Sequence, residues 1–157
     1  MIQRFADLLR FSLDSDRRAT VPMEEELAVV DAYLKIEKMR LGGRLRWRID
    51  APAERKTWPV PALSLLTLVE NSLKYAVAPR REGGSVCIRV CEEDSSLVLE
   101  VRDDGPGFED ENLPDGHGLD LLRRRIRSLY GGRAGLDIWR AAPGALVVLR
   151  LPKERVV

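Results

Sequence analysis

The most constraining feature of the sequence is the stretch from Leu66 to Tyr75, which reads with its flanks as a helix with a single polar stripe. At about 100° per residue, the polar side chains fall within an arc of roughly 140°, while leucine, valine and alanine take the rest. The stripe consists of Ser64, Thr67, Glu70, Asn71, Lys74 and Tyr75. Such a helix must be mostly buried, so the rest of the chain has to supply a core around it. The stripe itself fits either an ordinary solvated face or a surface for a charged ligand.

The chain of 157 residues is long enough for one domain with a hydrophobic core and a short extension. Its 26 basic and 25 acidic side chains leave a net charge of +1, which gives no electrostatic argument for binding nucleic acid or an anionic membrane. The apolar runs are too short to span a bilayer, and no secretory signal opens the chain. We therefore expect a cytosolic module that contacts neither nucleic acid nor membrane.

The two cysteines, Cys87 and Cys91, lie in a run that alternates like a strand. Four residues apart on a strand, their Cα atoms would be separated by roughly 13 Å, which is too far for a disulfide. Because the sequence contains a single histidine, His117, a zinc site is not expected either. We expect both cysteines to be small core residues.

The other elements follow from hydrophobic periodicity and turn residues. Residues 1–13 are predicted to form the end of a longer helix, and residues 14–20 a linker. Further helices are predicted at 22–39 and 119–130, strands at 44–50, 85–91, 97–102, 136–139 and 145–151, and an irregular proline-containing connection at 52–61. This order does not alternate as a doubly wound nucleotide fold would. It predicts an α/β (α+β) two-layer sandwich, in which helices cover one face of a mixed, mainly antiparallel sheet.

Two glycine-containing loops have residues suited to binding a nucleotide. The first, Asp103-Asp104-Gly105-Pro106-Gly107, leaves a strand, where a carboxylate can accept a hydrogen bond from an exocyclic amine and glycines let the backbone approach a ligand. The second, Gly116-His117-Gly118-Leu119, opens a helix and exposes backbone N–H groups that suit phosphate oxygens. Each loop alone is a weak signal, and the chain contains no P-loop motif.

The order of the motifs is far more specific than any one of them. The helix with Glu70-Asn71-x-x-Lys74-Tyr75, followed by the two glycine loops, resembles the N, G1 and G2 boxes of the ATP-binding superfamily that includes histidine kinases, gyrase, Hsp90 and MutL. Nearly the whole chain also resembles the LytS-type sensor histidine kinases, with further similar stretches at Val21 to Leu27, Tyr33 to Arg40 and Arg123 to Ile126. This resemblance implies the Bergerat-type ATP-binding fold, with ATP and Mg²⁺ as cofactors.

The resemblance also implies a role for each residue of the helix motif. Asn71 would be the Mg²⁺ ligand, and Glu70 beside it would order a metal-bound water or the attacking group. Lys74 would meet phosphate, and Tyr75 would lie against the base. Glu70, Asn71 and Lys74 would thus form the catalytic set, which acts by neutralising and positioning the phosphates.

The glycine loops would hold the two ends of the nucleotide. The resemblance implies that Asp103 accepts a hydrogen bond from the adenine amino group, and that Gly105 and Gly107 admit the base and open a flexible lid over residues 108–115. The second loop would close over the phosphates, with ATP contacts from Gly116, His117, Gly118 and Leu119.

The implied protein is larger than this chain. Residues 1–19 would be the end of a truncated dimerisation helix with its linker, and residues 20–157 the catalytic domain. The phosphoacceptor histidine would lie upstream, so this chain alone is not expected to phosphorylate itself. The implied partners are ATP, the dimerisation and histidine-phosphotransfer segment of the parent kinase and a response regulator. The parent protein could be anchored in the inner membrane.

Several residues depart from the family pattern. Asp104 replaces a usual Asn, Asp120 and Leu121 replace a Lys-Asn pair, and Ala145 replaces a Thr. A carboxylate at Asp104 would weaken phosphate binding if it faced the nucleotide, and the loss of Asn at Leu121 could lower affinity or turnover. These departures leave open a non-catalytic nucleotide-gated interaction domain. Two further alternatives are an anti-sigma serine kinase of the same fold, which the LytS-like stretch from Tyr33 to Arg40 disfavours, and a purely structural domain.

Overall fold

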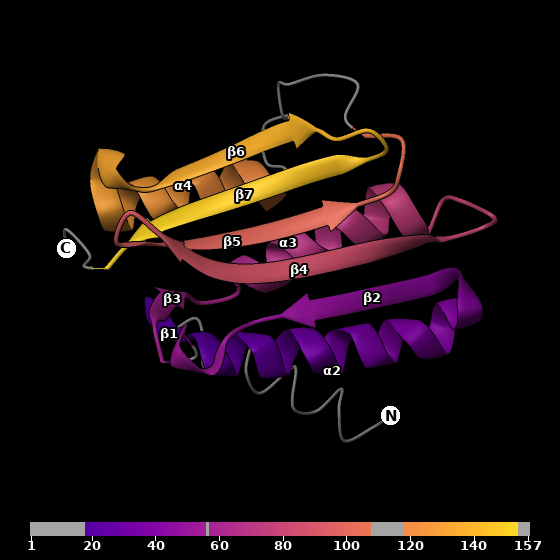
Figure 1. The fold of residues 1–157 in the computed structure, drawn as a ribbon, viewed down its shortest axis with the longest axis horizontal. Helices are drawn as coiled ribbons and strands as arrows, with labels where there is room; N and C mark the ends of the chain where they lie inside the picture. Colours follow the sequence, from indigo (N-terminus) through magenta and orange to yellow (C-terminus); the bar gives the residue numbers. More distant parts are fainter. Residues whose placement is uncertain (1–17, 56, 108–117, 154–157) are drawn as a thin grey trace.

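The computed structural model of the chain describes residues 18–55, 57–107 and 118–153. Its main sheet contains β2 (Leu45–Asp50), β4 (Gly84–Glu93), β5 (Ser96–Asp103), β6 (Gly135–Arg140) and β7 (Ala145–Pro152). The strand order is β2-β4-β5-β7-β6, with β2 and β4 parallel and every other neighbouring pair antiparallel. Helices α3 (Ser64–Ser72) and α4 (Gly118–Tyr130) lie behind this sheet, and α2 (Met23–Leu41) runs beside β2 (Figure 1). The predicted two-layer sandwich with a mixed, mainly antiparallel sheet is confirmed.

Helix α2 forms where the sequence predicts it, one residue later at its start and two residues later at its end. Three glutamates occupy its first turn, where the helix dipole favours negative charge, and basic residues occupy its last turn. Gly42 follows it with a φ of 61°, a conformation that glycine adopts without strain. Its buried face includes Met23, Val30 and Leu34, and it also includes the charged residue Glu26.

The core lies between the helices and the sheet. The helices contribute leucines together with Ile126 and Tyr130, and the strands contribute alternate valine, leucine and isoleucine residues. Fully buried members with the largest side chains include Tyr130, Met23, Leu34, Leu45, Leu65, Leu68, Leu73, Ile88, Leu97, Leu99, Leu119 and Ile126. This packing fixes α3 and α4 against the same side of the sheet.

Helix α3, which contains most of the stretch from Leu66 to Tyr75, ends differently from the prediction. The α-helical part stops at Ser72, and Leu73–Val77 form a π-helical turn in which the Ala78 N–H donates to the Leu73 carbonyl at 2.8 Å. A π turn is wider than an α turn, so a wheel at 100° per residue no longer describes the directions of Lys74 and Tyr75. Such turns often occur at functional sites. Ser64 also differs, because it is buried rather than part of a wet stripe.

A second, two-stranded sheet was not predicted. Strand β1 (Thr20–Pro22) pairs antiparallel with β3 (Pro59–Pro61), inside the connection that we expected to be irregular. The Met23 N–H donates to the Trp58 carbonyl at 2.9 Å and joins this sheet to the start of α2. Three-residue strands that contain prolines lack the alternating pattern by which strands are recognised in a sequence.

The prediction that both cysteines are core residues is wrong. Cys87 is exposed and Cys91 is partly exposed. On β4 the residues that face the helices are Val86, Ile88 and Val90, so the alternation of the strand directs both thiols to the helix-free face.

Several predictions lie outside the described residues. These are the helix at 1–13, most of the linker, the lid over 108–115, and the positions of Gly116 and His117. Within the described part of the chain, no helix combines the length and apolar character needed to cross a membrane.

Candidate functional site

Two adjoining cavities form one elongated cleft along α3. The inner cavity has a volume of about 320 Å³ and is lined by Asn71, Tyr75, Ala76, Asp103, Pro106, Gly107 and Ala145. The outer cavity has a volume of about 220 Å³ and is lined by Thr67, Glu70, Asn71, Lys74, Tyr75, Gly118 and Leu119. Asn71 and Tyr75 line both cavities, so they stand where the two meet. The cleft therefore brings residues of all three sequence motifs onto one surface.

Asn71 sits at the centre of the cleft with an unused acceptor. Its side chain is 7% exposed, and its buried Oδ1 has no hydrogen-bond partner among the described residues. A buried amide oxygen without a partner is unusual, because its desolvation is not compensated. A hard oxygen of this kind is the type of ligand that Mg²⁺ prefers. The side chain thus fits the metal that the resemblance implies.

Asp103 closes the inner cavity and is held by the backbone. It is 6% exposed, and its Oδ1 accepts the N–H of Gly105 at 3.0 Å and the N–H of Ala145 at 3.2 Å. Burial raises the pKa of this carboxyl, and the two backbone hydrogen bonds oppose the rise. Ala145 holds Asp103 through its backbone N–H, so the replacement of the usual Thr by Ala leaves this hydrogen bond in place.

The two glycines of the first loop are required for different reasons. A Cβ on Gly105 would lie 2.4 Å from the Cβ of Ala76 and 2.7 Å from its Cα, so this glycine lets the loop pack against the π-helical turn. Gly107 has a φ of 80°, and a Cβ there would lie 2.9 Å from the Gly144 carbonyl oxygen. Gly105 thus serves close packing within the protein, and Gly107 lines the inner cavity itself.

Charged groups at the outer cavity are more accessible. Glu70, Lys74 and Tyr75 are all exposed, and the Lys74 Nζ lies 5.2 Å from the centre of the Tyr75 ring. This distance permits a cation–π contact. Partial desolvation of the Glu70 carboxyl, together with the nearby charge of Glu37 on α2, raises its pKa. Gly118 opens α4 at the same cavity, where the first N–H groups of a helix favour an anion.

The departures from the family pattern lie away from both cavities, apart from Ala145. Asp104 accepts the Ser85 N–H at 2.9 Å and a hydrogen bond from Arg80 Nη1 at 3.3 Å, and it lines neither cavity. Its carboxylate is therefore neutralised locally instead of facing the cleft. Leu121 is 54% exposed on α4 and lines neither cavity, while Asp120 pairs with Arg124 at 3.1 Å.

The sequence missed four residues of the cleft wall. Thr67, Ala76, Pro106 and Ala145 line it but were not assigned a site role. One sequence cue could have identified Ala76: it is a small residue directly after Tyr75. Its small size matters because Gly105 packs against it. Glu70, Asn71, Lys74, Tyr75, Asp103, Gly107, Gly118 and Leu119 all line the cleft, and Gly105 supports it.

Comparison with known proteins places this geometry in a family. Residues 62–155 match the family described as histidine kinase-, DNA gyrase B- and HSP90-like ATPase, and residues 1–45 match the family described as histidine kinase. The sensor protein LytS of Staphylococcus haemolyticus is 27% identical over 168 residues, which cover 99% of this chain and 29% of that protein. The sensor histidine kinase BtsS of Escherichia coli K12 is 31% identical over 134 residues, covering 84% of this chain and 24% of that protein.

The chain thus spans less than a third of the length of these curated relatives. Among solved structures, the catalytic domain of histidine kinase ThkA has the same fold, with a TM-score of 0.68 at 15% identity, and the match covers 87% of this chain and 97% of that one. The family match, the LytS relatives and the shared fold lead to one assignment. The chain belongs to the histidine kinase-, DNA gyrase B- and HSP90-like ATPase family, as the ATP-binding catalytic domain of a LytS-type sensor histidine kinase.

Proposed function

We propose that this domain holds Mg-ATP along the cleft, with the adenine in the inner cavity and the phosphates in the outer cavity. The observation that carries the proposal is the position of the unpartnered Asn71 Oδ1 between the two cavities. Asp103, with one oxygen fixed by two backbone N–H groups, can accept from the adenine amino group through the other. At the opposite end, Lys74 and the start of α4 meet the phosphates.

The residues at the junction of the cavities prepare the transfer step. Asn71 would hold Mg²⁺, which when bound supplies positive charge to the phosphate oxygens. Glu70, whose pKa is raised by its surroundings, stands next to Asn71 and can orient a water or the attacking group by accepting its hydrogen bond. Lys74 keeps its ammonium beside the Tyr75 ring and can move toward a phosphate while Tyr75 covers the base.

In the parent protein, we propose that the γ-phosphoryl group passes to a histidine on a dimerisation segment and then to an aspartate of a response regulator. Residues 1–19 would belong to the end of that dimerisation helix and its linker, and residues 20–157 would form the catalytic domain. The domain would work in the cytoplasm, in a parent protein that is anchored in the inner membrane.

Two measurements test this function. Titration calorimetry with ATP, in the presence and absence of Mg²⁺, should show binding that the metal strengthens. Transfer of labelled γ-phosphate to a supplied dimerisation segment that carries the acceptor histidine should then occur, and a segment with that histidine replaced by Gln should stay unlabelled. Binding without transfer would favour a non-catalytic nucleotide-gated domain. Absence of nucleotide binding would leave only a structural role.

A further inference from the structure

Glu26 is a buried carboxylate outside the nucleotide cleft. It lies on α2 with 0% of its surface exposed, although it is charged in water at neutral pH. A buried carboxylate is costly unless several hydrogen bonds or an opposite charge compensate it. None of the roles proposed above for the cleft residues uses this side chain, so its contacts indicate what it does.

Both oxygens of Glu26 bind the start of α3. Its Oε1 accepts the Leu63 N–H, and its Oε2 accepts the Leu65 N–H at 3.1 Å. Helix α3 has no side-chain cap of its own at Leu63, which has a φ of 64° that a leucine rarely adopts. The first N–H groups of a helix need acceptors, and a negative charge there also favours the helix dipole. A carboxylate from α2 thus caps the helix that carries Asn71.

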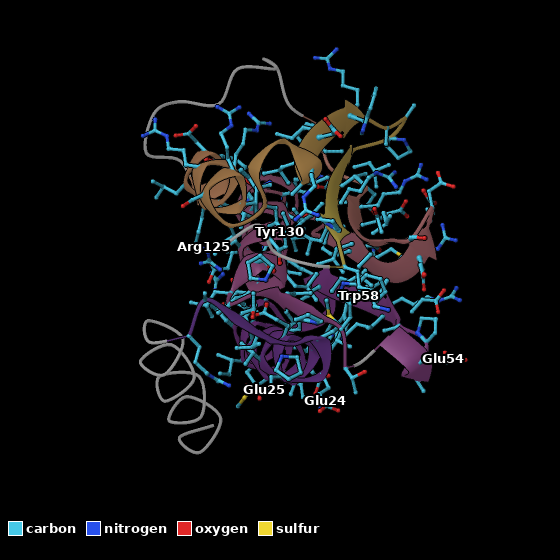
Figure 2. The ribbon with its side chains drawn as sticks, turned by 90° about the vertical axis from the view of Figure 1, so that its left-hand side faces the viewer. Glu24, Glu25, Glu54, Trp58, Arg125 and Tyr130 are labelled. Atoms are coloured by element: carbon cyan, nitrogen blue, oxygen red, sulfur yellow. The ribbon has the colours of Figure 1, made fainter. Side chains whose placement is uncertain are left out.

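A cation from the third helix completes this junction. Arg125 of α4 donates a hydrogen bond through Nη2 to the carbonyl of Ala62, the residue just before Leu63. In Figure 2, Arg125 extends from α4 toward the start of α2, whereas Glu24 and Glu25 lie on the other side of α2. Among the described residues, Arg125 is the charged group whose field acts on Glu26, and the other groups that act on the carboxylate are the backbone N–H groups of Leu63, Leu65 and Leu66.

We propose that Glu26 is a positioning residue for the ATP site, which sets the start of α3 relative to α2 and α4 and thereby places Asn71 between the two cavities. Asn71 lies eight residues after Leu63, or about 12 Å along a helix, so a shift at the start of α3 is transmitted to the cleft. The inference rests on the proposed use of the cleft for Mg-ATP. It extends that function to a residue that does not touch the ligand.

The ionisation state of Glu26 gives this role a measurable signature. An ionised carboxylate accepts both N–H groups, whereas a protonated one turns one oxygen into a donor and weakens one of the two bonds. Burial raises the pKa of Glu26 to about 7, although the backbone N–H groups and Arg125 favour the ionised form. The capping bonds are therefore complete above this pH and are weakened below it.

The test compares Glu26→Gln, which resembles the protonated form, with the wild type and with Glu24→Gln as a control. Glu24 is exposed on the same helix and carries the same charge. The dissociation constant for Mg-ADP is measured by titration calorimetry between about pH 5.5 and 8.5, on either side of the Glu26 pKa. At the upper end, Glu26→Gln should bind about three- to tenfold more weakly, because only part of the free energy of a lost hydrogen bond to a charged group is transmitted from the start of α3 to the cleft. The difference in dissociation constant between Glu26→Gln and the wild type should disappear as the pH falls. Glu24→Gln should bind as the wild type does at every pH.

Equal affinities of the wild type and Glu26→Gln at the upper end of the pH range would overturn the inference. A ratio of their dissociation constants that stays constant across the pH range would also overturn it. A wild type that binds no nucleotide at any pH would instead contradict the proposed function. If Glu26→Gln does not fold, Arg125→Gln provides the second test. Loss of the cation disfavours the ionised Glu26, so the pH at which affinity falls should move upward. An unchanged midpoint in that variant would also count against the role of Glu26.

Discussion

The two halves of the cleft are built differently. The inner cavity is walled by groups that the fold holds in place: Asp103 is buried and bonded to two backbone N–H groups, and Gly105 packs against Ala76. The charged groups at the outer cavity, Glu70 and Lys74, are exposed. The walls of the inner cavity are thus fixed before any ligand binds, as the proposed recognition of the base requires. The proposed phosphate end, in contrast, presents accessible charges that a ligand and metal would order.

Asn71 joins the two halves, so its replacement should have the largest effect. Asn71→Ala removes the buried Oδ1 and should weaken Mg-ATP binding by at least about 100-fold, because even outer-shell partners of a metal contribute up to that much. Titration calorimetry with and without Mg²⁺ measures the change. Asn71→Leu is the matched control for the loss of the oxygen without loss of side-chain volume. Full activity of Asn71→Ala in the complete kinase would contradict the metal assignment.

Asp103→Asn tests the preorganised half. Its Oδ1 can still accept the Gly105 and Ala145 N–H groups, but an amide NH₂ replaces the second acceptor and opposes the adenine amino group. Loss of a hydrogen bond that involves a charged group predicts about 10- to 100-fold weaker ATP binding. Competition between ATP and GTP measures selectivity, which should fall in the variant. An unchanged preference for ATP would show that Asp103 does not read the base.

A pair of glycine substitutions compares the packing of the two halves. Gly105→Ala places a Cβ within 2.7 Å of the backbone at Ala76, whereas a Cβ on Gly118 would meet only the Thr67 Cγ2 at 3.6 Å. Overpacking predicts that Gly105→Ala lowers the free energy of unfolding by about 1–3 kcal/mol. Gly118→Ala should leave it nearly unchanged. Urea denaturation of both variants gives the comparison, and equal losses would show that the two halves are equally tight.

The sequence predicts the sheet, the three described helices and the motif residues of the cleft well, because these depend on periodicity and on residues with strong local preferences. Apolar alternation places β4 and β5, and Gly42 marks the end of α2. Residues around Asn71 and Asp103 were identified through the order of their motifs. Their meeting in one cleft follows from the sheet, which brings the end of β5 next to α3.

What the sequence did not predict depends on contacts between distant segments. Asp104 is directed away from the cleft by Arg80 and by the Ser85 N–H, and neither partner can be inferred from the loop itself. Glu26 looks like one more acid in the first turn of α2 until α3 supplies its N–H donors. The π-helical turn after Ser72 likewise has no local signal, since its residues are ordinary helix formers.

Lys74→Ala tests the exposed half, and its effect should be smaller. Because the ammonium is exposed, its attraction to phosphate is screened by solvent and salt, and its loss should weaken Mg-ATP binding by only about fivefold. Lys74→Arg is the control that keeps the charge. Binding measured at low and high salt should show the difference between wild type and Lys74→Ala shrinking as salt rises. A loss as large as that of Asn71→Ala would mean that Lys74 becomes buried with the ligand.

The smallest effect is expected at Leu121, where the family pattern has Asn. Because this side chain is 54% exposed and lines neither cavity, Leu121→Asn should change Mg-ATP affinity by less than about twofold. Calorimetry on the variant and on Leu121→Ala separates a gained amide from a lost apolar group. A gain of affinity specific to Asn would show that bound phosphates reach the exposed face of α4. The binding surface for the phosphates would then extend beyond the present walls of the outer cavity, whereas the walls of the inner cavity would be unchanged.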